Sequence, residues 1–563
     1  MRRLFVLVLV ACSPSGSNSS DDGSGGDGGS GDGAGPRAPR LIPGPGEPGY
    51  DAELAAKASA YDRQFHTFST MPFGLSLDAM VPDPANRDLI AAFLAQDAVD
   101  DFATFANKSV RDIVSEYDEH GDLGMFAGAA AAGDAFRYMA LRDAGLDASR
   151  ARQDLLAAIA AFHVAATITG TPGTVARGVR RLDEPGIAPA VEVPPTSCPQ
   201  AGDRGNRWRP DGSGQHPEWI YNDNNSKDQI IGYVFALGAF WDALANDSAI
   251  PQAVRDQLQS DARQLATSLM TPVQLGFAGS ADLVVRDWHD CPTKHLDLNP
   301  RVVPIDGYDP LILAPSSTTQ NGWNALAALG VMRTLYHITG DADVGHYYYD
   351  ELVGNRKFPL LAVSGPARVS AMYQDGSVDT NFSNVNMAFV AAYGLLRYES
   401  DPALRTTYEN LLATELWDVG HPHDGKSIQQ AFFNLLDSAF RTGGNDAPTT
   451  AAAVAQLHQF AMPPYFEPVV ENCDASELAA GTCIAIDGTT QITLVAPNDA
   501  TSRVALPKRL RPPSNFEWRS DPRSVNGGGS IRLDPGGDML SAYWLGRAMS
   551  TGSNVSPLAR PAP

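Results

Sequence analysis

The sequence predicts an all-α protein, an (α/α)6 toroid of helical hairpins with small β-hairpin insertions. Two observations support this fold class. Six segments are apolar on nearly all sides, and each pairs with an amphipathic segment. A helix that is apolar all round is buried, whereas a helix with one apolar face borders solvent. The spacing between the apolar segments also varies, from roughly forty to about a hundred residues, which fits a closed ring with long loops better than a regular solenoid. An irregular all-α domain or a solenoid is the alternative.

The segments follow one another as hairpins. The expected inner helices span 124–141, 227–245, 321–340, 384–400, 427–443 and 538–550. The expected outer helices span 147–166, 251–270, 341–353, 401–417 and 447–462. The last inner helix needs a partner from the N-terminus, which 51–68 or 87–106 would supply. Within 227–245, Gly232 and Gly238 allow close helix packing.

Two short stretches read as β-hairpins inserted into the helical pattern. Residues 368–379 carry a turn signal at Asp375-Gly376, and residues 484–495 carry one at Asp487-Gly488. Asp-Gly between alternating residues favours a two-residue hairpin turn. The second hairpin belongs to a small insertion at about 465–510, before the last helix.

Bulk composition sets outer limits on function. The chain has 563 residues, of which 43% are hydrophobic, enough for one large domain over residues 50–550. Its formal net charge is −23, and an acidic surface repels the phosphate backbone, so we expect no nucleic-acid partner. Nothing in the pattern demands more than a monomer.

The N-terminus reads as an export signal. "MRRLFVLVLVAC" has two basic residues followed by an apolar run that is too short to span a bilayer, which is typical of a signal peptide over residues 1–12. "LVAC" resembles the lipobox of bacterial lipoproteins, which implies cleavage before Cys12 and lipidation of its thiol. Ser13, rather than Asp, follows the cysteine and by the same resemblance favours the outer membrane. An ordinary signal peptide with a chance cysteine is the alternative.

The following stretch has almost nothing to bury. Residues 13–49 are mainly Gly, Ser, Asp and Pro, which predicts a flexible tether with a root-mean-square span of roughly 35 Å. Residues 551–563 are expected to form a disordered tail. The sequence therefore predicts a protein of the bacterial cell envelope that contacts the membrane only through its lipid anchor. Whether it lies on the periplasmic or the outer surface of the outer membrane is left open by the sequence.

The other four cysteines are even in number, which in an exported chain suggests two disulfides. We favour Cys198–Cys291 and Cys473–Cys483, with two other pairings left open. A zinc site that combines Cys291 with His289 and His295 is the rival interpretation, although its spacing matches no standard site.

In a closed ring of hairpins, all inner helices run the same way and begin at one mouth, where polar residues precede every apolar segment. In "YNDNNSKDQ" (221–229), Ser226 and Gln229 fit a capping box, and Asp228 suits the positive end of the helix dipole. Capping does not account for the other polar residues there. Carboxylates, amides and indoles around a mouth suit a carbohydrate site. The expected ligand-binding residues are Asn222, Asp223, Lys227, Trp288, His289, Asn321, Trp323, Asn384 and Asn386, and Trp208 and Trp219 lie on the same loops.

Four stretches together resemble the six-hairpin glycosidase superfamily. They are "GDLGMFAGAAAAGDAFRY", "TGTPGTVARG", "NSKDQIIGYVFALG" and "FEWRSDP…DMLSAYWLGR". The resemblance covers most of residues 110–550 as architecture and assigns no single family. It implies a polysaccharide or oligosaccharide substrate and acid/base chemistry by carboxylates.

Glycoside hydrolysis needs two carboxylates across the scissile bond. Asp122, Asp228 and Asp538 are the candidates, because each begins an inner helix, although a cap or a structural ion pair is the plainer role for any one of them. The alternatives are a polysaccharide lyase and a non-catalytic glycan-binding lipoprotein. A lyase would use Tyr221, His289 or His295 as base, with Arg177 and Lys227 neutralising a uronate.

No cofactor is expected. The sequence has no phosphate loop, no Rossmann fingerprint and no HExxH motif. Calcium bound by the Asp- and Asn-rich stretch 222–228 would lack EF-hand spacing, so we assign no metal site.

Overall fold

The fold is described from a computed structural model. All described residues belong to one compact unit that begins at Pro39. It describes residues 39–550 except 71–72, 97–100, 199–204, 305–310, 315–319, 374–381, 419–423, 442–446, 513–520 and 530. Cys12, the expected signal peptide, most of the expected tether and the expected tail lie outside this part of the chain. No helix within it is long and apolar enough to cross a bilayer.

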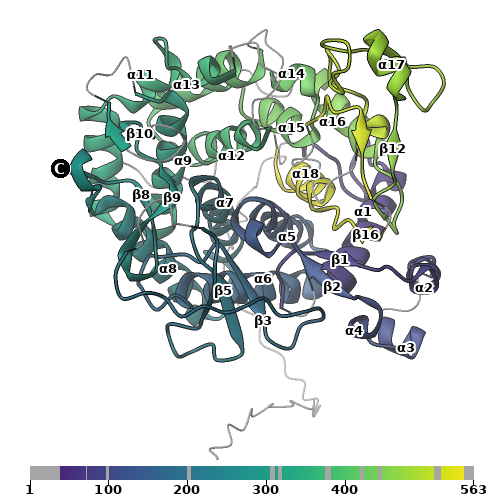
Figure 1. The fold of residues 1–563 in the computed structure, drawn as a ribbon, viewed down its shortest axis with the longest axis horizontal. Coiled ribbons are helices and arrows are strands. Elements are labelled where there is room, and N and C mark those ends of the chain that lie inside the picture. The colour runs from purple at the N-terminus through teal and green to yellow at the C-terminus, as the bar shows by residue number, and fades with distance from the viewer. Residues whose placement is uncertain are drawn as a thin grey trace, which may run out of the picture. The chain divides into compact units, whose positions relative to one another are not determined.

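Six inner helices form a closed ring, as the sequence predicts. Each contacts the next in chain order, and the last contacts the first, as Figure 1 shows around the centre of the unit. The ring consists of α5 (Gly128–Asp143), α7 (Lys227–Leu244), α9 (Gly322–Thr339), α12 (Phe382–Tyr398), α15 (Ala431–Phe440) and α18 (Gly537–Ala548). The protein is therefore an all-α (α/α)6 toroid.

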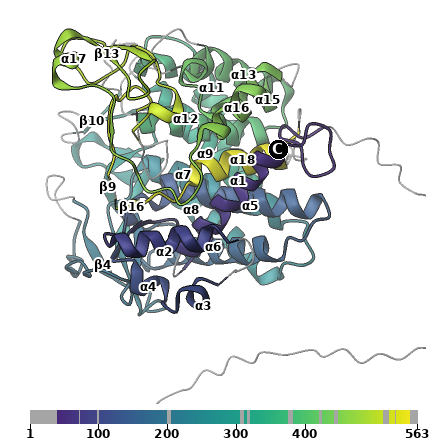
Figure 2. The same cartoon turned by 90° about the vertical axis from the view of Figure 1, so that its right-hand side faces the viewer.

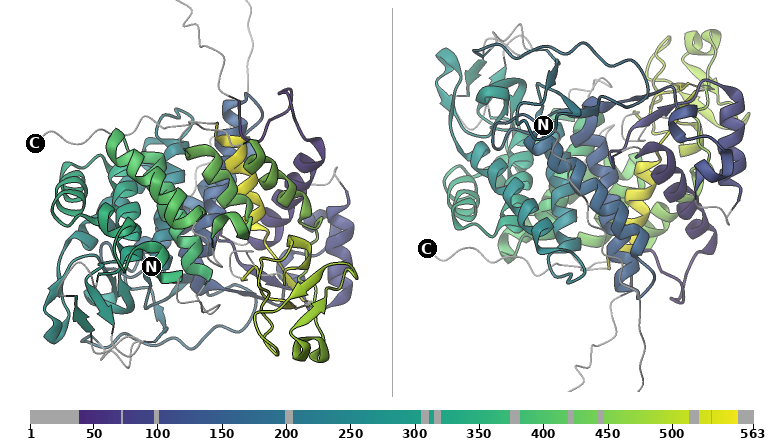
Figure 3. Two further views of the ribbon diagram at one scale, coloured as in Figure 1. Left: turned by 90° about the horizontal axis from the view of Figure 1, so that it is seen from above. Right: turned by 90° about the horizontal axis from the view of Figure 1, so that it is seen from below.

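The outer layer follows from the hairpin pattern. Each outer helix packs on the inner helix that precedes it: α6 (Ser149–Thr167), α8 (Gln252–Met270), α10 (Ala342–His346) with α11 (Phe358–Val363), α13 (Pro402–Leu411) and α16 (Ala447–Gln459). The sixth outer helix is α1 (Ala52–Gln64), which packs on α18; Figure 3 shows purple α1 beside yellow α18. Of the two N-terminal segments proposed as its partner, the first is therefore the one that closes the ring.

Glycines let inner helices approach closely where they share a border. A Cβ on Gly124 would clash with the backbone of Gln229, and one on Gly232 would clash with the backbone of Gly124. Gly238 in turn lies against Thr334 of α9 and the ring of Tyr398. These contacts explain why the apolar inner segments carry glycine despite its cost in a helix interior.

Aromatic side chains fill the axis of the ring. Phe235 of α7 lies 5.0 Å from Tyr393 of α12 and 5.9 Å from Phe432 of α15, between ring centroids. Phe136 of α5 lies 6.1 Å from both Phe235 and Tyr393. Side chains from four of the six inner helices thus meet on the axis, so the ring has a solid centre.

The chain between the ring helices forms short strands and further short helices, and Figure 2 shows several of the strands on one side of the ring. The further helices are α2 (Pro84–Leu94), α3 (Phe102–Ala106), α4 (Val110–Ile113), α14 (Gly425–Ile428) and α17 (Ala475–Ala480). One three-stranded sheet has the order β16 (Arg532–Leu533), β1 (Asp78–Met80), β2 (Glu116–Asp118). The other has the order β3 (Gly178–Arg181), β5 (Trp219–Asn222), β4 (Trp208–Pro210), antiparallel throughout.

The remaining strands are paired antiparallel in twos. They are β6 (Val273–Gln274) with β7 (Ser280–Ala281), β8 (Val284–Asp287) with β9 (Cys291–Asp297), β10 (Val302–Pro304) with β11 (Leu311–Leu313), β12 (Val470–Glu471) with β15 (Asn526–Gly527), and β13 (Thr482–Ile484) with β14 (Gln491–Thr493). Only the last of these pairs, β13 with β14, was predicted from the sequence.

The two hairpin predictions have different outcomes. β13 and β14 form the hairpin around Asp487-Gly488. The other prediction is wrong over Val369–Tyr373, which form a 3-10 helix, while its turn lies outside the described residues. Val369 and Ser370 are buried, and Glu415 accepts a hydrogen bond from the Ser370 amide, so packing against the outer layer overrides the local pattern.

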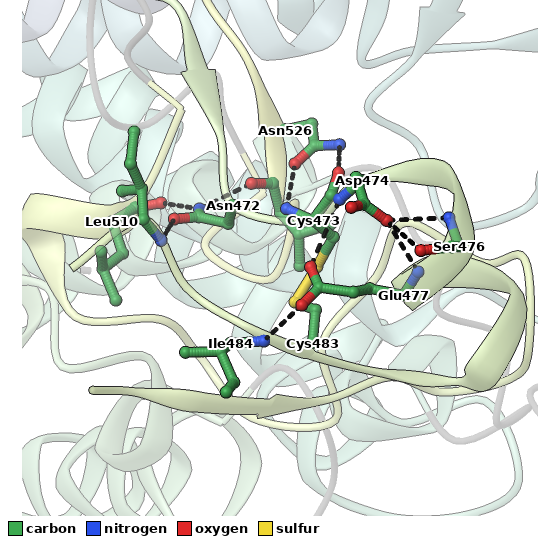
Figure 4. Close-up of a disulfide and its surroundings, with 11 residues drawn as sticks. Asn472, Cys473, Asp474, Ser476, Glu477, Cys483, Ile484, Leu510 and Asn526 are labelled. Atoms are coloured by element: carbon green, nitrogen blue, oxygen red, sulfur yellow. Dashed lines mark hydrogen bonds between the residues drawn. A yellow bond between two sulfur atoms is a disulfide. The ribbon is translucent and has the colours of Figure 1, made fainter. Parts of the chain in front are cut away.

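A second, smaller core lies in the insertion before α18. It holds Cys473, Cys483, Ala485, Ile492, Leu494, Leu506, Leu510 and Val525, separate from the ring core. Cys473 and Cys483 form a disulfide, and Figure 4 shows Asn472 and Asn526 bonded to backbone around it. The other disulfide joins Cys198 to Cys291, so Cys291 is not free to bind zinc.

The folded part begins earlier than the expected boundary at residue 50. The Leu41 amide donates to the Met549 carbonyl, and the Ile42 amide donates to the Gly546 carbonyl. Both side chains are buried. Ile42 fills the space that the missing side chain of Gly546 leaves on α18, which is why this part of the expected tether is held.

Candidate functional site

The first turns of the inner helices meet at one end of the ring, which we call the N-terminal face. Gln229 of α7 contacts Asp122 before α5, Lys227 of α7 contacts Asn324 of α9, and Trp323 of α9 contacts the Asn384 backbone of α12. These cross-links place the starts of four inner helices together, as a closed ring of hairpins requires.

On the α5 side, Asp122 is held by two neighbours. The Gln229 Nε2 donates to Asp122 Oδ1 at 3.1 Å, and Gln229 Oε1 accepts from the Met125 amide at 2.8 Å. Arg177 Nη2 lies 3.9 Å from Asp122 Oδ1, while its Nη1 donates to Ser226 Oγ at 3.0 Å. The Asp122 side chain keeps 17% of its surface exposed, so it remains accessible to a ligand.

The predicted capping box at the start of α7 is wrong. Ser226 is the N-cap residue, but its side chain makes no capping hydrogen bond. Its hydroxyl accepts from Arg177, and Gln229 reaches across to α5 instead. Both side chains therefore organise the N-terminal face rather than their own helix.

On the α9 side, a second carboxylate is held by a cation and an amide. Lys227 Nζ lies 3.2 Å from both Asp297 Oδ2 and Asn324 Oδ1, and Asn324 Nδ2 donates to Asp297 Oδ2 at 3.0 Å. Lys227 Nζ also lies 5.2 Å from the centroid of Trp323. Asp297, at the end of β9, was not a sequence candidate, because nothing in its local pattern distinguishes it.

Asp228 lies between these two groups on the face of α7 that points toward the ring axis. It precedes Phe235 by seven residues, which is almost two full turns, and Phe235 belongs to the aromatic centre. Its side chain is half-buried. Among the described residues, Asp228 has no side-chain hydrogen bond and no ion pair, unlike Asp122 and Asp297.

The amides of α12 and α15 complete the inner surface of this end. Asn386 precedes the axial Tyr393 by seven residues and is fully buried. Gln430, the N-cap residue of α15, is buried, and its amide nitrogen has no partner among the described residues. The side-chain oxygen of Asn434 likewise has no partner among them.

Asn321 acts as the cap of α9 and accepts from the Trp323 and Asn324 amides.

Asp538 is much less accessible than Asp122. It begins α18, keeps 4% of its surface exposed, and lies beside Gln430 and Lys508 in a small cavity. The Asp534 carboxyl, on the preceding loop, is also buried. Burial and the nearby Asp538 charge hold the pKa of Asp534 well above its usual value.

Two further carboxylates lie close together on the loops before α7. Asp287 accepts from the Asn224 and Trp288 amides, and Asp223 is bonded to Arg209 at 2.7 Å. Burial, reinforced by the Asp223 charge, raises the pKa of Asp287 to about 7. Asp223 is buried and bonded to Arg209 and to the Arg207 amide, which fits a structural role.

Several expected ligand-binding residues are buried or turned elsewhere. Trp288 and Trp323 keep only 2% and 1% of their surface exposed, so neither indole offers a face to a sugar ring. Trp323 instead donates to the Asn384 carbonyl. Asn222 is buried at the end of β5. His289 is exposed and packs beside Trp288.

The residues expected of a lyase are less well placed. Tyr221 is buried in β5, and burial raises the pKa of its hydroxyl far above its usual value, which disfavours a role as base. Arg177 and Lys227 are each within 4 Å of a carboxylate, Asp122 and Asp297 respectively.

Comparisons with known proteins give little beyond distant similarity. No protein-family model matches the sequence, and no curated protein matches it. Among solved structures, the chain is similar to a sugar epimerase from a ruminal bacterium, with 8% identity and a TM-score of 0.37 over 90% of this chain and 99% of that chain. It is also similar to an inactive variant of an alpha-1,6-mannanase of Salegentibacter sp. HEL1_6 in complex with alpha-1,6-mannotriose, with 8% identity and a TM-score of 0.28 over 89% of this chain and 99% of that chain. The fold assignment rests on the closed ring of helix contacts described above.

Proposed function

We propose that this protein is a carbohydrate-active enzyme, a glycoside hydrolase that cleaves a polysaccharide or oligosaccharide at the N-terminal face. The observation that carries the proposal is the placement of Asp228. It is a carboxylate without a protein partner in the described structure, on the axial face of α7, and Asp122 and Asp297 are anchored on either side. Two carboxylates that flank a bond are the groups glycoside hydrolysis requires.

The neighbours of each carboxylate suggest its part in the reaction. Asp122 accepts from Gln229 and lies near Arg177, which hold its carboxylate in place to activate water or attack the sugar. Asp228 has no bonding partner among the described residues, so its carboxyl is free to turn toward the leaving oxygen, and we assign it the role of the general acid. Asp297 holds Lys227 in place, and Asp538 is buried behind this surface.

The substrate class that fits best is a neutral glycan. The two cations nearest the reacting carboxylates, Arg177 and Lys227, each have an anionic neighbour in the protein. A uronate would have to compete with Asp122 or Asp297 for them. This favours a hydrolase over a lyase, while a binding protein with the same surface remains the second candidate because the fold does not fix the chemistry.

We also propose that the protein is a monomer tethered to the bacterial cell envelope through a lipid on Cys12, facing outward from the outer membrane or into the periplasm. The support is the sequence signal alone. Labelling of the full chain with radioactive palmitate in bacteria tests it: label that disappears in Cys12→Ser supports the anchor, and label that persists in this variant contradicts it.

A glycan screen tests the activity. The full chain would be incubated with dextran, xylan, yeast mannan and polygalacturonate while reducing ends and the absorbance of unsaturated uronates are followed. New reducing ends without absorbance support a hydrolase, and both signals together indicate a lyase. Binding without either signal over a long incubation would identify a glycan-binding protein instead.

A further inference from the structure

A pocket of about 430 Å3 lies in the outer layer, and its lining shares no residue with the N-terminal face described above. One side is the segment that follows α1, the other is α6, and α5 supplies the floor. Its volume falls in the range of sites that hold small organic ligands. The lining includes exposed positions of α6, among them Ala157 and Ala160, so the pocket is reached from solvent.

The floor is polar and pre-arranged. His66 lies 2.8 Å from the Asp62 carbonyl through Nδ1 and 2.8 Å from Asp134 Oδ1 through Nε2. Because both ring nitrogens face acceptors, the doubly protonated imidazolium satisfies both, and although burial opposes it, the Asp134 charge raises the pKa of His66. The second oxygen of Asp134 has no hydrogen-bond partner among the described residues, so an acceptor remains for a ligand.

The charges around the floor balance. Arg137 lies 3.4 Å from Asp62 and 2.9 Å from Asp154, and Arg150 lies 3.0 Å from Asp154. Three cations, His66, Arg137 and Arg150, therefore face three carboxylates, Asp62, Asp134 and Asp154. Arg181, which also lines the pocket, is paired with Asp183 at 2.8 Å. A balanced cluster offers hydrogen bonds but little net attraction for an ion of either sign.

The walls are apolar and aromatic. Half-buried Phe73 packs edge-on against Trp219 of β5, with ring centroids 4.7 Å apart. Trp219 itself keeps 6% of its surface exposed, and the Arg181 guanidinium lies 5.7 Å from its ring centroid. Opposite them, α6 contributes Ala160, Ala161 and Val164, whose small side chains leave the space open. An apolar wall with a partly exposed aromatic ring, beside planar polar groups, is a setting in which a sugar packs its apolar face and bonds its hydroxyls.

We propose that this pocket is a second glycan site, which holds one or two neutral sugar units of the substrate at a distance from the reacting carboxylates. The proposal deepens the proposed function and rests on it. Trp219, which was expected beside the mouth of the ring, lines this pocket instead. A polymer bound in the pocket would be held on the enzyme between cleavage events, so the site raises affinity for long substrates and leaves the chemistry of short ones unchanged.

Affinity electrophoresis of the full chain tests the proposal, in gels that contain dextran, xylan, yeast mannan or polygalacturonate. Ala160→Gln fills the pocket from an exposed helix position, and Trp219→Leu removes its aromatic wall. Ala253→Gln, at an exposed position of outer helix α8, is the matched control. Melting temperature is recorded for each variant, and hydrolysis of a trisaccharide is measured alongside.

The expected result is retardation of the parent chain by at least one neutral polysaccharide. Ala160→Gln should then weaken that retardation several-fold and Trp219→Leu about tenfold, with Ala253→Gln unchanged and trisaccharide turnover unchanged in all three. Equal retardation of parent and both pocket variants, retardation by polygalacturonate alone, or no retardation at all would overturn the proposal. So would a loss of trisaccharide turnover equal to the loss of binding. Pocket-dependent retardation without any turnover would instead reject the proposed hydrolase and leave the glycan site standing.

Discussion

The N-terminal face and the outer-layer pocket both gather carboxylates, but they neutralise them differently. In the outer layer, Asp62, Asp134 and Asp154 are matched by an equal number of cations. At the N-terminal face, Asp122 and Asp297 have nearby cations, whereas Asp228 has no partner among the described residues. A carboxylate left without a partner beside a built polar surface is available for acid/base chemistry, while the carboxylates of a balanced cluster stabilise the fold and can at most hydrogen-bond a ligand.

The largest effect should come from Asp228. If it donates or accepts the proton in the reaction, Asp228→Asn should lower kcat by about 10²- to 10⁴-fold. The melting temperature should barely change, because the side chain has no partner to lose. Steady-state kinetics on the best polysaccharide from the screen, together with thermal unfolding, would measure both.

Asp343→Asn is the matched control for this variant. Asp343 also lies in the first turn of a helix, α10, but on the exposed surface. It should keep full activity. Full turnover in Asp228→Asn as well would show that Asp228 takes no part in the reaction. The unpartnered carboxylate of the N-terminal face would then differ from the paired carboxylates of the outer layer in structure only.

The converse test applies to the outer layer. Arg137→Met leaves Asp62 and Asp154 buried with less positive charge around them, so the free energy of unfolding should fall by about 3–5 kcal/mol. The kcat of the protein that remains folded should not change. Chemical denaturation and activity below the unfolding transition would be compared. A fall in kcat with unchanged stability would mean that the cluster is functional rather than structural.

A smaller effect is expected at Lys227, which anchors the α9 side of the N-terminal face. Lys227→Met removes the cation beside Asp297 and should reduce kcat/KM by about tenfold, since a hydrogen bond to a charged group contributes about 1.5–3 kcal/mol. Lys426→Met is the control, because Lys426 forms an exposed ion pair with Asp418. Equal kinetics in the two variants would show that Asp297 does not depend on Lys227.

The smallest effect concerns pH and His66. Burial disfavours the charged imidazole, but the Asp134 charge and hydrogen bond outweigh it, so the pKa of His66 is raised above 6.5. The stability that protonated His66 adds is therefore fully present below about pH 6.5 and is lost as pH rises through the folded-state pKa. Unfolding free energies should show parent stability falling above pH 6.5 more steeply than that of His66→Gln. Parallel curves would mean that the ring is neutral in the folded protein.

The helical ring was predictable because its signal is repeated along the chain. Each inner helix combines apolar side chains on all faces with small residues, and this pattern does not depend on distant partners. The predicted segment 227–245 differs from α7 by one residue, and 321–340 differs from α9 by one at each end.

The candidate site was only partly predictable, because its contacts are made between elements. Asp122 and Gln229 are separated by 107 positions, and Lys227 and Asp297 by 70. Local rules assigned Ser226 and Gln229 to capping, since nothing in the sequence shows that Arg177 and Asp122 lie close enough to compete. The burial of Trp288 and Trp323 could not be foreseen for the same reason.

The way in which the ring closes affects how the protein is made. α1 needs α18 to cover its apolar face, and Leu41 and Ile42 bond to Met549 and Gly546 at the end of α18, more than 500 positions later. A chain emerging from the ribosome therefore carries its first outer helix without its inner-helix partner α18 until nearly the whole protein has been synthesised. The same adjacency brings the two ends of the folded unit side by side. A circularly permuted gene that joins them and opens the chain at an exposed loop should still encode a closed ring.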